Sequence, residues 1–467
     1  MSDVHSVHLQ ADVVRQGSAL LMLGLVLSIA AAVGVAFLNP LAALAIPAFA
    51  ALVAFVTITA HRTDLHVVLF VAGGILLLPD TMSLHAGQMI HVSWFATFML
   101  TWSLSQLLNH RPILQTTTDY LVLGLLVLGV LGGIVLGLMW GGISRTLFGE
   151  AVALSMLALY FPVRDACRRR PDTILLLAAA LCLLALVTVV NNILITRAAI
   201  VTATQQWQIV DVRAPGNEVL LLIPAIIVPA LLAVKQSSGR RVMLIGLLCI
   251  FFMGLIISKS RAYWVAWALG ILSLLILLKP DQRKRLGVTL GLSLLGLAAA
   301  AFVVLGDLAV ALVSGSLARL GTLSTAFAAD VSMLDRYSEH RALWERIRLN
   351  PILGYGFGTE YALYSIQSSG TRIWSYAHNG FLGLWYKTGF FGLLMMAILW
   401  GRAVFLGVRT YRSTALPPVH RAVVLGVCCA IIAVIPTIYT SSPFSHYASM
   451  CVIVTCLAIA LSHTTTT

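Results

Sequence analysis

The side chains best suited to chemistry in this chain lie between residues 333 and 392. Within this stretch, His378 and Asn379 stand where a polar segment ends and an apolar one begins. Histidine is the side chain that best removes a proton near neutral pH, and a hydroxyl nucleophile needs such a base. His378 is therefore the candidate catalytic base and Asn379 a candidate substrate contact. The competing interpretation is a histidine that caps the helix or makes a structural hydrogen bond.

The polar residues 333–349 precede Asn350-Pro351 and predict a helix that ends there. One stripe, at spacings of four, three and four, contains Arg336, His340, Leu343 and Ile347. A second stripe contains Tyr337, Arg341 and Trp344. The apolar members indicate that the helix lies against the membrane face of the protein, and a solvated amphipathic lid is the alternative. Arg336 and Arg341 are candidate catalytic cations, and His340 and Trp344 are candidate substrate contacts.

Basic residues in two short loops form a second group of candidates. Lys259 and Arg261 lie between two apolar spans, and Arg213 precedes another. Charges held there must reach the membrane surface or a cavity, where ionisable residues are usually functional. Guanidinium groups match phosphate oxygens in a bidentate fashion, so these residues could bind a diphosphate. The alternative is that they contact lipid head groups or helix ends.

Two further patterns indicate what the chain lacks. Gly354-x-Gly-x-Gly358 has no preceding strand, so it predicts a turn rather than a nucleotide-binding loop. The seven cysteines contain no CxxC spacing, and no histidine pattern has metal-ligand spacing. We therefore expect no metal and no cofactor.

The composition is that of an integral membrane protein, because 60% of the 467 residues are hydrophobic and only 10% are charged. The net charge of +13 fits lipid head groups better than nucleic acid. About twenty apolar residues span a membrane, which predicts an all-α fold of about 12–14 transmembrane helices. The candidate spans lie near 18–38, 41–59, 65–79, 89–107, 119–141, 145–162, 173–195, 218–234, 242–257, 262–279, 286–304, 380–400, 421–440 and 444–462.

Charge also predicts the orientation. Most Lys and Arg residues fall in alternate loops, which include Arg164, Arg402, Arg409 and Arg412, and this places both termini in the cytoplasm. The expected organisation is helices 1–11 in residues 1–305, a long outer loop with an amphipathic helix in 306–378, and helices 12–14 in 379–467.

The region from Arg213 to Gly392 resembles the superfamily of O-antigen ligases and polymerases. The resemblance comprises Ser-Arg261 between two spans, an Arg/Trp helix, Asn-Pro-Ile-Leu-Gly-Tyr-Gly-x-Gly, and the pattern His378-Asn379-x9-Gly389-x-x-Gly392. The loop helix of that family reads Arg-x-x-x-aromatic, but here His340 lies four residues before Trp344. Either Arg336 or Arg341 therefore takes the place of the family arginine.

The resemblance implies a metal-independent glycosyltransferase of the class C type in the bacterial inner membrane. Such enzymes move a glycan from undecaprenyl diphosphate to an acceptor hydroxyl on the periplasmic face. By position, His378 is then the base, Arg261 a diphosphate ligand and Arg213 a second ligand. The expected function is an O-antigen ligase with lipid A–core as acceptor.

Other functions stay open at this point. A polymerase would add the lipid-linked chain to a lipid-linked repeat, and a third acceptor is a protein hydroxyl. A membrane transporter is the alternative of another class. Transporters place ionisable residues at mid-membrane and show internal repeats, whereas here Glu150 is the one carboxylate well inside a predicted span and the two halves show no repeat.

Overall fold

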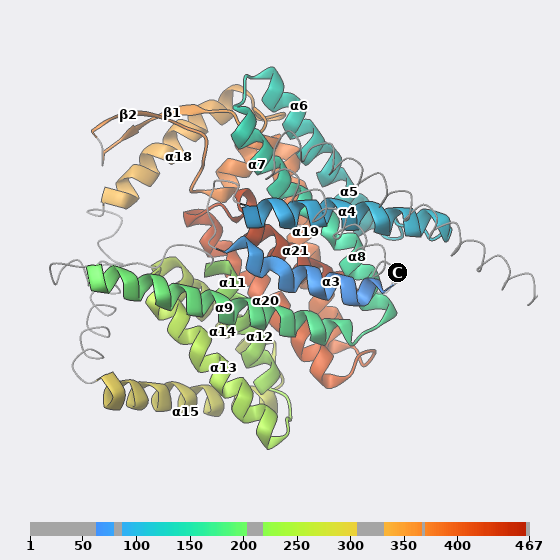
Figure 1. The fold of residues 1–467 in the computed structure, drawn as a ribbon, viewed down its shortest axis with the longest axis vertical. Coiled ribbons are helices and arrows are strands. Elements are labelled where there is room, and N and C mark those ends of the chain that lie inside the picture. Colours follow the sequence, from blue (N-terminus) through green and yellow to red (C-terminus); the bar gives the residue numbers. More distant parts are fainter. Residues whose placement is uncertain (1–61, 79–85, 203–217, 306–330, 367–368, 464–467) are drawn as a thin grey trace, which may run out of the picture. The chain divides into compact units, whose positions relative to one another are not determined.

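A computed structural model describes residues 62–78, 86–202, 218–305, 331–366 and 369–463 of the chain (Figure 1). The first two predicted spans and Arg213 lie outside the described residues. The chain divides into two compact units, one of Met1–His66 with Val92–Arg111 and the other of Val67–His91 with Pro112–Thr467. In the smaller unit, the Trp94 indole donates to His66 Nε2 over 2.9 Å, and the Phe98 ring stacks on the His66 imidazole.

Helices make up almost all of the described chain. Those in the first half are α3 (Thr63–Ala72), η1 (Gly73–Leu77), α4 (Ala86–Leu108), α5 (Thr117–Gly124), the π-helical η2 (Leu125–Leu131), α6 (Gly132–Met139), α7 (Ser144–Ser155), η3 (Met156–Leu159), α8 (Tyr160–Arg169) and α9 (Thr173–Thr202). They are followed by α11 (Glu218–Leu222), α12 (Pro224–Leu232), α13 (Ser238–Ile257), α14 (Arg261–Leu277) and α15 (Pro280–Leu305).

The polar segment after α15 contains α18 (Val331–Leu349) and a β-hairpin of β1 (Tyr361–Ser365) and β2 (Gly370–Trp374). The strands are antiparallel, with Tyr361 opposite Trp374 and Ser365 opposite Gly370. Figure 1 shows the hairpin lying along α18. The predicted helix is confirmed at both ends to within two residues, whereas the hairpin was not predicted.

The last part of the chain forms α19 (Gly380–Arg412), α20 (Pro418–Thr440), the short η4 (Pro443–Ser445) and α21 (Tyr447–Leu461). Helices α19 and α20 pack side by side, and α20 also packs on α12 and α14 (Figure 1). Most residues of α20 and every residue of α21 are buried, which is why their sequences are apolar all round.

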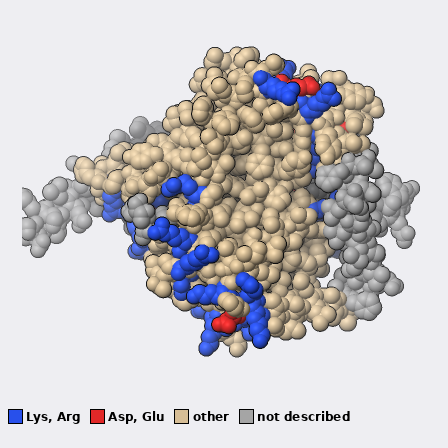
Figure 2. Space-filling view, turned by 180° about the vertical axis from the view of Figure 1, so that it is seen from behind, with Lys and Arg blue, Asp and Glu red and all other residues tan. Residues whose placement is uncertain are grey.

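Six helices are long and apolar enough to cross a membrane: Thr117–Met139, Ser144–Arg169, Thr173–Ala198, Ser238–Ile257, Gly380–Arg412 and Pro418–Thr440. Four shorter apolar helices accompany them: Thr63–Leu77, Glu218–Leu232, Arg261–Leu277 and Tyr447–Leu461. All ten lie on predicted spans, so the prediction of a helical membrane protein is confirmed. Figure 2 shows Lys and Arg gathered in separate groups on an otherwise mostly uncharged face.

The four arginines named above in inner loops lie instead in helices, Arg164 in α8 and Arg402, Arg409 and Arg412 in α19. Arg164 is buried in α8, where it forms an ion pair with Asp119 and donates to the Ile113 carbonyl. Asp119 also closes the N-terminal capping box of α5 with Thr116. Arg402 lies within α19 because that helix continues about three turns beyond the apolar run that predicted it. Its guanidinium donates a hydrogen bond to the Thr118 hydroxyl. The side chains of Arg164 and Arg402 therefore have partners within the bundle.

Candidate active site

The site is built on one row of α18 residues spaced by four. Asp335 accepts hydrogen bonds from the Ser365 hydroxyl and the Ile366 amide at the end of β1. Leu343 and Ile347 are fully buried in a cluster with Tyr355, Tyr361, Leu363, Ala377 and Tyr386. The apolar half of the row therefore fixes α18 against the hairpin and α19, and the acidic half lies beside the end of the loop.

Glu339 is the fourth member of this row and contacts His378 twice. The carboxylate lies 2.6 Å from the His378 Nδ1 through Oε2, and it accepts the His378 backbone amide over 2.5 Å through Oε1. The Glu339 side chain is 4% exposed, whereas that of His378 is 38% exposed. Because a carboxylate accepts, Nδ1 carries the proton and Nε2 is the nitrogen that can receive one.

Aromatic hydroxyls complete the surroundings of the pair. The Tyr361 hydroxyl is shared between Glu339 Oε1 at 3.2 Å and the Tyr376 carbonyl at 2.7 Å. Burial, and then the charge of Glu339, raise the pKa of Tyr361, so this phenol stays a neutral donor. The Tyr376 ring meets the His378 ring edge-on with centroids 5.1 Å apart, and its hydroxyl accepts the Ser442 amide. The imidazole is thus held from two sides.

Asn379 is the N-cap of α19. Its side-chain oxygen accepts the amides of Phe381 and Leu382, and the residue is 4% exposed. An N-cap of this kind satisfies amides that have no partner within the helix. The helix therefore begins directly after His378, and the structure gives Asn379 a capping role where the sequence suggested a substrate contact.

His340 and Arg336 lie on the neighbouring row of α18 and face the same site. Both His378 and Arg336 act electrostatically on His340, whose ring meets that of Tyr439 on α20 edge-on with centroids 5.3 Å apart. Burial lowers the pKa of His340, and its Nε2 is buried without a hydrogen-bond partner among the described residues. These residues bring a cation and a neutral imidazole close to the Glu339–His378 pair.

Arg341 and Trp344 point elsewhere. The Arg341 guanidinium pairs with Glu345 over 3.2 Å, and its side chain is 84% exposed. The Trp344 ring meets Trp385 edge-on and stacks under Arg348. Of the two candidate arginines, Arg336 is the one that acts electrostatically on His340.

The start of α14 holds Lys259 and Arg261. Lys259 has φ 50°, a left-handed conformation that is rare for such a residue and that often marks functional sites. Two residues after Arg261, Tyr263 interacts with Glu218, Tyr376 and the side chains of Thr437 and Ser441. Since Tyr376 also touches the His378 ring, this end of α14 lies at the same end of the bundle as His378.

The glycine-rich turn after α18 repairs a break in α19. At Gly389 the helix is interrupted, with φ 70° and ψ −178°. The amide of Phe390 bonds to Pro351 and Ile352, while the carbonyls of Tyr386 and Lys387 accept the amides of Tyr355 and Gly356. Backbone groups that lose their partners within α19 at the break thus form hydrogen bonds with the turn. The predicted turn is confirmed.

Close approach explains why glycines occupy this turn. Gly354, Gly356 and Gly358 all have positive φ, and a Cβ on Gly356 would collide with the backbone of Gly137 on α6. A Cβ on Gly389 would collide with the Ile352 carbonyl. The turn therefore lies between α6 and α19 and joins the polar segment to the membrane helices.

A buried ion pair closes the same region. Lys387 lies 3.2 Å from Glu150 of α7 and donates to the Thr359 carbonyl over 2.9 Å. Glu150 also accepts the Gly358 amide over 2.8 Å. The one carboxylate deep in a predicted span is thus neutralised by a lysine and used to hold the turn. Among the residues that the structure covers, no three His, Cys, Asp or Glu side chains are grouped as metal ligands.

Glu339 was missed in the sequence. A glutamate inside a polar helix is typical of a solvated face, and the stripe chosen there began at Arg336. The row Asp335, Glu339, Leu343 and Ile347, with spacings of four throughout, carried the signal: two apolar residues on one face imply that the carboxylates of that face are inward too. A carboxylate, a histidine with one free nitrogen and a nearby arginine can together accept a proton next to a bound anion.

Comparison with known protein families adds to this geometry. Residues 245–397 match the family model described as O-antigen ligase. This segment is therefore similar to O-antigen ligases, and the described part of the chain has six helices long and apolar enough to cross a membrane. The matched segment includes Arg261, all of α18, Glu339 and His378, and it excludes Arg213. No curated protein matches the chain significantly.

Proposed function

We propose that this protein is an O-antigen ligase-type glycosyltransferase that moves a glycan from undecaprenyl diphosphate to a hydroxyl of lipid A–core on the periplasmic face. The observation that carries the proposal is the Glu339–His378 pair, in which a buried carboxylate holds a partly exposed imidazole at the start of α19. Both residues lie in the segment that matches the O-antigen ligase family.

In the proposed reaction, His378 Nε2 takes the proton of the acceptor hydroxyl. The acceptor oxygen forms a bond to the anomeric carbon of the donor sugar, and the bond from that carbon to the diphosphate oxygen breaks. Glu339 keeps the Nδ1 proton in place and stabilises the imidazolium that forms. Undecaprenyl diphosphate leaves with the electron pair of the broken bond, so no metal or nucleotide has to take part.

The leaving diphosphate gains negative charge as the bond breaks, so cations that bind it lower the barrier. Arg336 is the preferred loop arginine, because it acts electrostatically on His340, as His378 also does, whereas the Arg341 side chain is 84% exposed. Arg261 is the second ligand that we propose, and Lys259 at the same helix start would support it. Arg213 remains a proposed ligand that lies outside the described residues.

The acceptor defines the main alternative. A polymerase would use the same histidine and arginines but would add the lipid-linked chain to a second lipid-linked repeat. The His-Asn-x9-Gly-x-x-Gly pattern favours the ligase. Transport has less support, because Glu150 is neutralised by Lys387 and used to hold the glycine turn.

The test is a transfer assay with purified full-length protein in detergent. Undecaprenyl-diphosphate glycan is supplied with and without lipid A–core, and the products are separated on a gel. We expect glycan on lipid A–core. Lengthening of the lipid-linked glycan without that acceptor would instead establish a polymerase, and no transfer in either condition would contradict the proposed enzyme class.

A further inference from the structure

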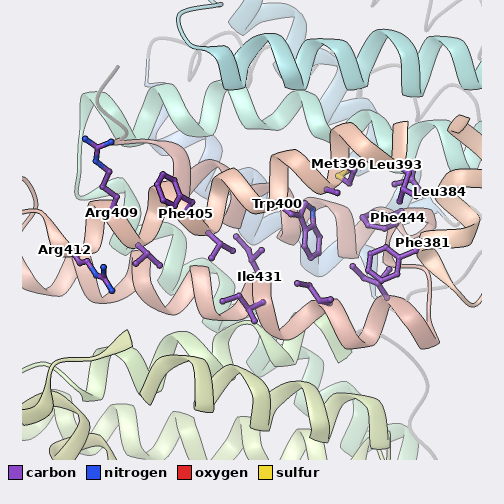
Figure 3. A pocket seen from close by; sticks show the side chains of 17 residues that line it. Phe381, Leu384, Leu393, Met396, Trp400, Phe405, Arg409, Arg412, Ile431 and Phe444 are labelled. Atoms are coloured by element: carbon purple, nitrogen blue, oxygen red, sulfur yellow. The ribbon is translucent and has the colours of Figure 1, made fainter. Parts of the chain in front are cut away.

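A long apolar groove lies between α19 and α20 (Figure 3). Its volume is about 780 Å³. Two adjacent rows of α19 form one wall: Leu393, Ala397, Gly401, Phe405 and Arg409, and Met396, Trp400, Val404, Val408 and Arg412. Ile431, Ile432, Ile435 and Ile438 of α20 form the other wall.

The two ends of the groove differ in chemistry. One end is apolar, with Phe381 and Phe444, and the other carries the guanidinium groups of Arg409 and Arg412 (Figure 3). Both arginines are exposed, and neither side chain forms a hydrogen bond or an ion pair with another described residue. No Asp or Glu is among the residues that line the groove, so the lining itself leaves this positive charge unbalanced.

The groove is open at Gly401 because this residue has no side chain. A Cβ built on Gly401 would have no atom within 4 Å, although the residue lies in the interior of α19. Glycine is a poor helix former, so its presence here costs stability that alanine or leucine would not. This position thus widens the groove on the side toward Arg409 and Arg412.

The part of the groove from Ala397 to Arg409 matches one leaflet of a bilayer in length. Ala397 and Arg409 are twelve residues apart on a helix that rises about 1.5 Å per residue, which gives roughly 18 Å. Half of a hydrocarbon core of about 30 Å is roughly 15 Å. A lipid with its phosphate at Arg409 and Arg412 would therefore reach the middle of the membrane at Ala397.

We infer that this groove is a binding site for an anionic phospholipid, whose phosphate pairs with Arg409 and Arg412 and whose acyl chain lies over Gly401. Basic pockets between membrane helices recognise anionic head groups in this way. A zwitterionic lipid carries a cation in its head group, and the guanidinium groups of Arg409 and Arg412 would repel that cation. The inference is independent of the reaction at His378.

The charge is tested with the double variant Arg409→Gln/Arg412→Gln and a matched control, Lys235→Gln/Arg240→Gln, which removes two exposed cations outside the groove. Full-length protein stripped of lipid is titrated with phosphatidylglycerol or phosphatidylcholine, and bound lipids are counted by native mass spectrometry. We expect wild type and the control to prefer phosphatidylglycerol, and the groove variant to bind it about thirtyfold more weakly. Equal binding by the groove variant, or no preference in wild type, would overturn the inference.

The groove itself is tested with Gly401→Leu, which fills the open space, improves helix propensity and keeps both arginines. Long-chain phosphatidylglycerol should bind at least tenfold more weakly, whereas the dihexanoyl form should bind as in wild type. Unchanged binding of the long-chain lipid would overturn the inference. Equal binding of a polyprenyl phosphate by wild type and by Arg409→Gln/Arg412→Gln would also overturn it, because the groove would then bind a prenyl chain and not an anionic phospholipid.

Discussion

Two buried carboxylates, each paired with a basic side chain, differ in what surrounds the partner. Glu150 and Lys387 are both about nine-tenths covered, at 11% and 8% exposure, and they also bond to backbone groups of Gly358 and Thr359 at the glycine turn. Glu339 is equally covered, at 4%, but His378 is 38% exposed and has one free ring nitrogen. The first pair is closed on all sides and can only hold structure, whereas the second presents a group that can exchange a proton.

The comparison predicts that variants of the two pairs fail in different assays. The largest effect on transfer should come from His378→Ala, because it removes the proposed base. We expect the rate to fall roughly 10³-fold while the protein still inserts and unfolds at the wild-type temperature. The rate is measured per folded molecule in detergent, and a variant with the wild-type rate would contradict the assignment.

Glu339→Gln should come next. The amide cannot hold the Nδ1 proton or stabilise an imidazolium as a carboxylate does, so we expect kcat to fall roughly 10²-fold with KM nearly unchanged. Glu339→Asp should recover part of the loss. A rise in KM with constant kcat would show that Glu339 acts on binding instead.

Variants of the Glu150–Lys387 pair should change the stability of the protein and leave the rate of transfer unchanged. Glu150→Gln leaves Lys387 charged and buried without its counter-ion, which typically costs about 3–5 kcal/mol. The double variant Glu150→Gln/Lys387→Met removes both charges and should be more stable than the single one. Thermal unfolding of each variant measures this, and transfer per folded molecule should stay at the wild-type rate. A loss of kcat in folded Glu150→Gln protein would remove the distinction between the pairs.

The glycine turn offers a sharper test of how the closed pair works. Gly356→Ala places a Cβ against the Gly137 backbone at a φ of 82°, and we expect a loss of about 2 kcal/mol or more. Gly246→Ala is the matched control, because its Cβ meets no atom within 4 Å in the interior of α13, and it should be neutral or slightly stabilising. Equal stability of the two variants would contradict the packing described for the turn.

The smallest expected effect concerns His340. Its pKa in the folded protein is lowered by burial, so folding favours the neutral ring. That contribution is fully present above the unfolded value of about 6.5 and is lost as the pH falls toward the folded pKa. His340→Gln should therefore flatten the decline of unfolding temperature between pH 7 and pH 5, and an unchanged slope would contradict it.

The sequence predicted the ten apolar helices and a helix start directly after His378, because hydropathy and helix starts are local properties. It did not predict Glu339, since the partner of a side chain on α18 depends on how the helix packs after a loop of 28 residues, from Asn350 to Ala377. The hairpin was missed for a similar reason. In β1, only Tyr361, Leu363 and Ser365 face inward. Asp335 of α18 accepts hydrogen bonds from the Ser365 hydroxyl at the end of the strand and from the Ile366 amide that follows it.

The break at Gly389 shows a further limit. The motif glycines were visible, but the role of Gly389 depends on the backbone of Ile352 and Leu353, which lies too close to it for a side chain. Such contacts join segments separated along the chain, so no periodicity indicates them. The extension of α19 to Arg412 was missed because a helix can continue past its apolar run once its arginines find partners or reach the surface.

The most direct test of the central claim is a double-mutant cycle in the rate of glycan transfer, with wild type, His378→Ala, Glu339→Gln and the double variant. If Glu339 acts through His378, the double variant should transfer glycan no more slowly than His378→Ala alone, because the carboxylate has nothing left to position. Additive losses in the double variant would contradict the account and give Glu339 a role of its own.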